Sequence, residues 1–144
     1  MNVDRNAMQM RLAIAAFLGF SAVGNFGPTS EAANRFALTC IENKTNEIVN
    51  YRFRWGDDGE WASRTLQPNA RRAHSWRYNN PNQRKSPGLH IRFDSDLSSR
   101  MISQGYRLDS YASPQQTDCK AYGKEYVFRY DGTAGKYIDL KGVR

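Results

Sequence analysis

The chain has 144 residues, of which 40% are hydrophobic and 24% are charged, and its formal net charge is +7 at neutral pH. This length suits one domain, and the apolar fraction is too high for a disordered chain. No apolar run reaches the roughly 18 residues that a membrane-spanning helix requires. Length and composition therefore exclude a large multidomain enzyme, a collagen-like rod and a multispanning membrane protein.

The first 32 residues have the three parts of a secretory signal peptide. Arg5 and Arg11 precede an uncharged apolar run at residues 12–23, and the small residues Ser30 and Ala32 follow it. This order is typical of a cleaved export signal. We therefore predict a signal peptide at residues 1–32 and one exported domain, secreted or periplasmic, at residues 33–144. The alternatives are a cut near Gly24 and a buried N-terminal helix of the fold.

Short segments of alternating polarity recur along the predicted domain, separated by Gly, Pro, Asn and Asp. In the strongest of them the odd-numbered residues 49–55 share one face, while Asn50, Arg52 and Arg54 take the other. Residues 94–101 fit either a loop or one helical turn. The predicted strands are residues 36–42, 47–55, 60–66, 71–78, 89–94, 106–111, 125–130 and 137–140.

Several short strands at regular spacing, with turn residues between them, are typical of an all-β domain. Large aromatic side chains and long polar stretches occur on the strand faces, which favours two packed sheets. We therefore predict an antiparallel β-sandwich of about seven to eight strands. A small β-barrel is the alternative, because periodicity alone does not separate the two architectures.

Cys40 and Cys119 are the two cysteines of the chain. An even number of cysteines in an exported domain indicates a disulfide. Neither cysteine belongs to a CxxC pair, and the two histidines lack the spacing of a zinc finger. The sequence therefore predicts a Cys40–Cys119 disulfide that closes a loop of about 80 residues.

The net positive charge is concentrated between residues 61 and 93, which hold seven basic side chains and no acidic one. Aromatic residues lie among them, and arginine forks together with flat rings suit carboxylate, phosphate or sugar ligands. A solvated polar face with no ligand would give the same pattern. The predicted binding residues are Arg71, Arg72, Arg77, Arg84 and Lys85, with Trp76 and Tyr78 as stacking surfaces.

An exported basic domain suggests an anionic partner of the cell envelope. We expect an envelope polymer, an acidic glycan, a phospholipid headgroup or an acidic protein surface. Nucleic acid is disfavoured because an exported protein seldom meets it. The leading hypothesis is thus a non-enzymatic binding or accessory domain, and an inhibitor or structural interaction module is an alternative.

Evidence for chemistry at a catalytic or metal site is sparse. A small hydrolase would need His74 or His90 as its base, but His74 shares a strand face with Trp76 and is expected to be packed. Asp94 and Asp96 resemble the start of a calcium loop, although the later positions of an EF-hand do not match and an Asx turn explains them as well. No cofactor is implied. Residues 43–45 form an N-glycosylation sequon.

Overall fold

The computed structural model describes residues 35–98 and 101–143, so the predicted signal peptide lies outside the described residues. Within them the chain forms nine strands and no helix that could cross a membrane. The strands are β1 (Phe36–Asn43), β2 (Val49–Trp55), β3 (Ala62–Leu66), β4 (Arg71–Arg77), β5 (Leu89–Asp94), β6 (Ser103–Leu108), β7 (Tyr111–Ser113), β8 (Lys124–Asp131) and β9 (Tyr137–Gly142).

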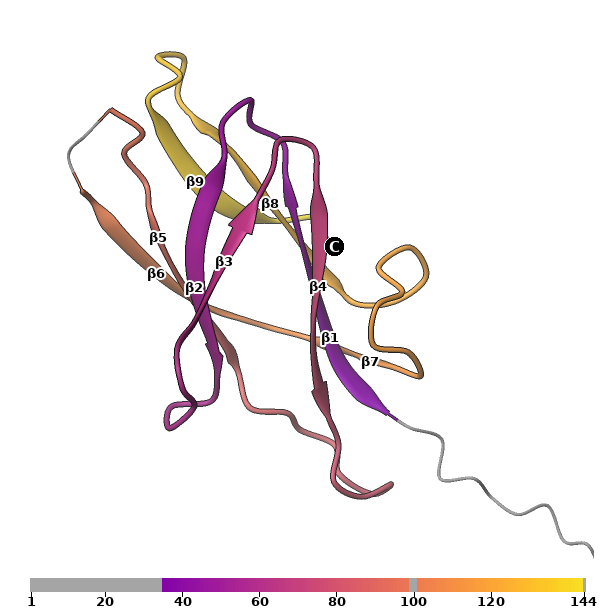
Figure 1. The fold of residues 1–144 in the computed structure, drawn as a ribbon. Helices are drawn as coiled ribbons and strands as arrows, with labels where there is room; N and C mark the ends of the chain where they lie inside the picture. The colour runs from indigo at the N-terminus through magenta and orange to yellow at the C-terminus, as the bar shows by residue number, and fades with distance from the viewer. Residues whose placement is uncertain (1–34, 99–100, 144) are drawn as a thin grey trace, which may run out of the picture.

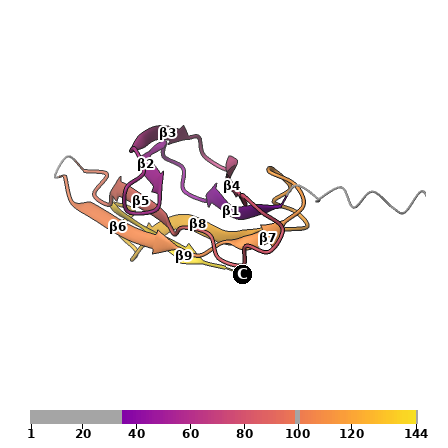
Figure 2. The same cartoon turned by 90° about the horizontal axis from the view of Figure 1, so that it is seen from below.

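The strands form two sheets that pack against each other (Figure 1). One, which we call the β1 sheet, has the order β4-β1-β8-β9, and β7 also pairs with β1. The other, the β2 sheet, has the order β3-β2-β5-β6. Figure 2 shows β2 and β3 at the top and β8 and β9 at the bottom of the molecule. The predicted β-sandwich is confirmed, and the described strands do not close into a barrel.

The core lies between the two sheets and follows the alternation of the sequence. Leu89, Ile91 and Phe93 of β5 are buried, as their period of two predicts, while His90 and Arg92 point away from the core. Phe128 of β8 packs edge-on against Phe93, with the ring centroids 5.0 Å apart. The inward face of each strand is therefore set by apolar residues at alternate positions.

β1 is the central strand of its sheet and is buried on both faces. It pairs with β4 on one side, and on the other with β7 along its first half and β8 along its second half. Ile41 belongs to the core between the sheets, whereas Leu38 and Cys40 form a second apolar cluster with Cys119. The predicted Cys40–Cys119 disulfide is confirmed, and it holds the segment before β8 against the outer face of β1.

The prediction of one strand at residues 106–111 was wrong. β6 ends at Leu108 and pairs with β5, whereas β7 begins at Tyr111 and pairs with β1 in the other sheet (Figure 1). The crossing is fixed at Asp109, whose carbonyl accepts a hydrogen bond from Thr39 Oγ1 at 2.9 Å and whose N–H donates to Tyr126 Oη at 2.9 Å. Polarity alternation continues through such a crossing, so it did not reveal the break.

Asn43 holds the corner between β1 and β2. Its side chain is fully buried, and its Nδ2 donates to the carbonyls of Glu47 at 2.8 Å and Leu66 at 3.0 Å. Its Oδ1 accepts hydrogen bonds from the N–H and Oγ1 of Thr45. The amide of the sequon is thus used inside the folded domain and is not accessible for glycosylation.

Candidate functional site

Four arginines line one hollow of about 800 Å³, whose lining comes from all four strands of the β2 sheet and from β4 of the β1 sheet. We call it the arginine hollow. Each of four strands supplies one of these arginines, which are Arg52 from β2, Arg64 from β3, Arg72 from β4 and Arg92 from β5. Asn50, Ser63, Thr65 and Ser103 add neutral polar side chains to the lining. The hollow therefore joins both sheets and is rich in hydrogen-bond donors.

The four arginines are not neutralised by carboxylates. None of them forms an ion pair with any residue in the described part of the chain. Asp94 is the acidic residue of the lining, and its Oδ1 accepts hydrogen bonds from the N–H groups of Asp96 and Ile102 at 3.0 and 2.9 Å. Four guanidinium groups with one carboxylate give the hollow a net positive charge, which favours an anionic occupant.

The indole of Trp61 gathers three guanidinium groups on the outer face of the β2 sheet. The Cζ atoms of Arg52, Arg54 and Arg92 lie 5.8, 4.8 and 4.7 Å from its ring centroid. Arg52 and Arg92 are direct cross-strand partners, so their side chains leave the sheet on the same face. Cation–π attraction of about 0.5–1 kcal/mol at each partly exposed contact offsets part of the repulsion between these like charges.

Arg54 carries a buried donor that no described residue satisfies. Its Nε is buried and has no hydrogen-bond partner among the described residues. The same side chain lines a small hollow of about 240 Å³ together with Trp61, Arg92 and Arg107. We call this the Trp61 hollow. It lies beside the arginine hollow, because Arg92 lines both.

A buried tyrosine–histidine pair lies behind the arginine hollow. Tyr51 Oη and His74 Nε2 are 2.7 Å apart and share a hydrogen bond. Burial lowers the pKa of His74 to about 4, and the positive charges of Arg72 and Arg64 lower it further in the same direction. Burial also raises the pKa of Tyr51 to about 12, so both side chains are neutral at physiological pH. His74 is packed, as the sequence predicts.

This burial predicts a loss of stability in mild acid. The pKa of His74 is about 4 in the folded state against 6.5 for the free side chain, so the unfolded chain binds the extra proton between these values. The contribution of the neutral His74 to the free energy of unfolding is fully present above pH 6.5. It falls as the pH drops toward 4, by about 3 kcal/mol in all. Denaturant unfolding at a series of pH values measures this, and a His74→Gln variant should lose most of the slope.

A Tyr51→Phe variant is the control for that experiment. It removes the hydrogen bond but keeps the imidazole buried, so we expect lower stability at every pH with the acid slope retained. An unchanged slope in His74→Gln would contradict the prediction, because the slope would then come from other groups.

The structure distributes the predicted binding residues over several surfaces. Arg72 lines the arginine hollow, whereas Arg84, Lys85 and Tyr78 line a different hollow of about 500 Å³ near the end of the sandwich. Arg77 is exposed at the end of β4. Trp76 packs edge-on against Tyr78, with 5.5 Å between the centroids. The seven residues do not form one site.

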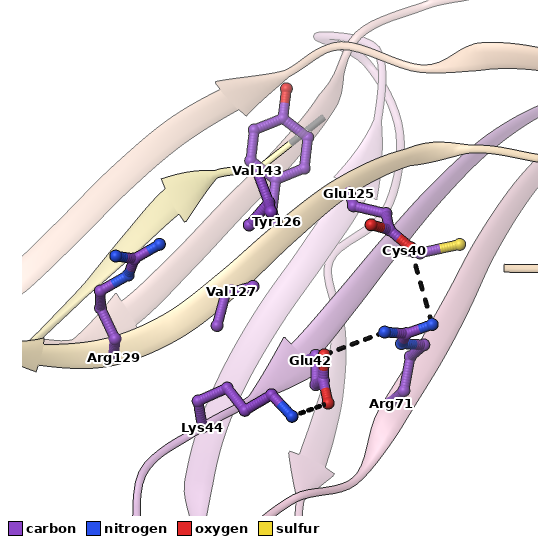
Figure 3. Close-up of a pocket in the computed structure, with 9 residues that line it drawn as sticks. All are labelled: Cys40, Glu42, Lys44, Arg71, Glu125, Tyr126, Val127, Arg129 and Val143. Atoms are coloured by element: carbon purple, nitrogen blue, oxygen red, sulfur yellow. Dashed lines mark hydrogen bonds and ion pairs between the residues drawn. The ribbon is translucent and has the colours of Figure 1, made fainter. Parts of the chain in front are cut away.

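Arg71 is held in an ion-pair network on the outer face of the β1 sheet (Figure 3). Its guanidinium lies 3.0 Å from Glu42 and 3.6 Å from Glu125, and Lys44 lies 2.6 Å from Glu42. Burial alone would raise the pKa of Glu42, but hydrogen bonds from Lys44 and Arg71 outweigh it and hold that pKa below its usual value. The positive charge of Arg71 is therefore used within the fold.

The residues considered for metal binding or catalysis have structural partners. Asp96 Oδ1 accepts hydrogen bonds from the N–H and Oγ of Ser98, so Asp94 and Asp96 both form Asx turns. Within residues 35–98 and 101–143, no three His, Cys, Asp or Glu side chains gather as metal ligands. His90 lies on the outer face of the β2 sheet, 3.2 Å from Asp57 Oδ1. His74 and His90 thus belong to different sheets.

Arg52 and Arg54 lie outside the basic segment at residues 61–93 and were not among the predicted binding residues. The alternation of β2 already placed them on its outward face, which was the available signal. The positions of Arg52 opposite Arg92 and of Arg54 opposite His90 depend on the pairing of β2 with β5, which the sequence alone does not state.

Comparison with known proteins adds no relative. No family model, no curated protein and no solved structure matches this chain.

Proposed function

We propose that this protein is a non-enzymatic binding domain for an anionic partner and that the arginine hollow is its binding site. The observation that carries the proposal is that four arginines from four strands line one hollow and that none of them forms an ion pair within the described residues. A guanidinium group presents a planar fork of donors that matches a carboxylate, sulfate or phosphate group.

We also propose that the domain acts outside the cytoplasm. A disulfide between Cys40 and Cys119 indicates an oxidising environment outside the cytoplasm. Together with the predicted signal peptide, it supports a secreted or periplasmic domain. The anionic partners that fit this compartment are envelope polymers, acidic glycans, phospholipid headgroups and acidic protein surfaces.

An Arg64→Gln/Arg72→Gln double variant tests the site. Both side chains are exposed, and neither is one of the three arginines described above at Trp61, so the stacked arginines are left unchanged. We expect the variant to bind a short galacturonate oligomer at least about tenfold more weakly, since each lost charge-assisted hydrogen bond contributes about 1.5–3 kcal/mol. Binding by the parent protein should also weaken steeply as salt is raised.

The matched control is an Arg129→Gln/Lys136→Gln variant. It removes the same charge at two exposed positions that do not line the hollow, so we expect binding close to that of the parent. Thermal unfolding of both variants confirms that they are folded. Equal weakening in the two variants would show non-specific attraction to net charge, and unaffected binding in Arg64→Gln/Arg72→Gln would overturn the proposed site.

A further inference from the structure

We propose that the anionic ligand is a linear acidic polysaccharide that runs from the arginine hollow across the β2 sheet to the end of the sandwich. This inference rests on the proposed function and names the ligand class. The path, which we call the basic track, consists of the arginine hollow, the Trp61 hollow and a third hollow at the end of the sandwich, the end hollow. The end hollow is lined by Arg84, Lys85, Arg107 and Lys124, among others.

Shared lining residues connect the three hollows. Arg92 lines the arginine hollow and the Trp61 hollow, and Arg107 lines the Trp61 hollow and the end hollow. A ligand that leaves one hollow therefore meets a guanidinium group that already belongs to the next. This continuity distinguishes a track from three separate anion sites.

Strand register sets the spacing of cations along the track. Arg54 of β2, His90 of β5 and Arg107 of β6 are successive cross-strand partners on one face. Because neighbouring strands are about 4.8 Å apart, the Arg54 and Arg107 backbones are separated by about 10 Å. The two arginines thus lie about two strand spacings apart, with His90 and its partner Asp57 between them. Arginines at this spacing suit a polymer that carries repeated anionic groups.

Gly88 allows Arg107 to join the last two hollows. A methyl group at this position would collide with Nε of Arg107, so the arginine side chain lies directly over the glycine backbone. Its guanidinium group thereby reaches the end hollow from the outer face of the β2 sheet. The absence of a side chain at Gly88 thus leaves the space that Arg107 occupies between the two hollows.

The track bends, and this favours a flexible chain over a planar membrane surface. Arg54 and Arg92 lie on the outer face of the β2 sheet, whereas Lys124 begins β8 in the other sheet. The end hollow also exposes an aromatic surface, because Tyr111 is 47% exposed with Lys124 Nζ 5.1 Å from its ring centroid. Tyrosine rings beside cations suit the combination of a sugar ring and an acidic group.

The test compares galacturonate chains of different length by isothermal titration with the whole domain. We expect the affinity, expressed per uronate residue, to rise about a hundredfold from a dimer to a chain long enough to occupy all three hollows. An Arg84→Gln/Lys85→Gln variant should bind the long chain about tenfold more weakly and should lose most of the gain in affinity that chain length brings. A methyl-esterified chain of the same length, which lacks the negative charges, should not bind.

The controls separate this inference from the proposed function. Arg129→Gln/Lys136→Gln should bind both chain lengths as the parent does. If the dimer binds but length brings no gain, or if anionic vesicles bind more tightly than the soluble polymer, the polysaccharide track is overturned and the arginine hollow remains. If no galacturonate, vesicle or acidic peptide binds, the proposed function falls as well.

Discussion

Replacing Cys40 and Cys119 together by alanine should lower the free energy of unfolding by about 4 kcal/mol. The two residues are separated by 79 positions, and a closed loop of that size restricts the unfolded chain strongly in the chain-entropy model. A loss of this size is a large share of the roughly 5–15 kcal/mol that stabilises a domain. Denaturant unfolding of the variant and the parent measures it.

Reduction of the parent protein separates the crosslink from the packing of the sulfur atoms. The reduced protein keeps both side chains, so we expect it to lose most of the stability that the double variant loses. Native-state hydrogen exchange should also show faster exchange in residues 114–123, since this segment is anchored to β1 by Cys119. If reduction lowered the free energy of unfolding by less than about 1 kcal/mol, the prediction for the crosslink would be contradicted.

Asn43→Ala is the second substitution with a large expected effect, a loss of about 3 kcal/mol. It removes two donated and two accepted hydrogen bonds from a fully buried side chain. Buried partners that are left unsatisfied cost about 1–3 kcal/mol each, and the turn from β1 to β2 loses its internal support. Thermal or denaturant unfolding measures the change.

Asn46→Ala is the matched control, because Asn46 is exposed in the same turn. It should change the free energy of unfolding by less than about 0.5 kcal/mol. If both variants lose the same stability, the effect comes from the turn backbone, and the buried amide of Asn43 is not the cause.

The strands were largely predictable because apolar residues at alternate positions must face a core. The segments 49–55 and 89–94 show this alternation of burial. His74 was also expected to be packed, and it is buried. The disulfide was predictable for a different reason, since two cysteines allow one pairing. The first inference uses the polarity of adjacent residues and the second uses the number of cysteines. Both can be read directly from the sequence.

The site was much less predictable because it depends on which strands pair. Arg71 and Arg72 are adjacent in sequence, yet their side chains leave β4 on opposite faces, one to Glu42 and Glu125 and the other to the arginine hollow. The distribution of charge along the sequence does not distinguish these two arginines. The gathering of Arg52 and Arg92 around Trp61 likewise requires the register between β2 and β5.

The parallel pairing of β1 with β8 has a consequence for the order of folding. The first described strand, β1, hydrogen-bonds to β8 near the other end of the chain, with Thr39 opposite Lys124. Contacts of such large sequence separation form late, because a long loop must close first. During synthesis β1 has β4 as its available partner, and its other side stays unpaired until residues 111–131 have followed.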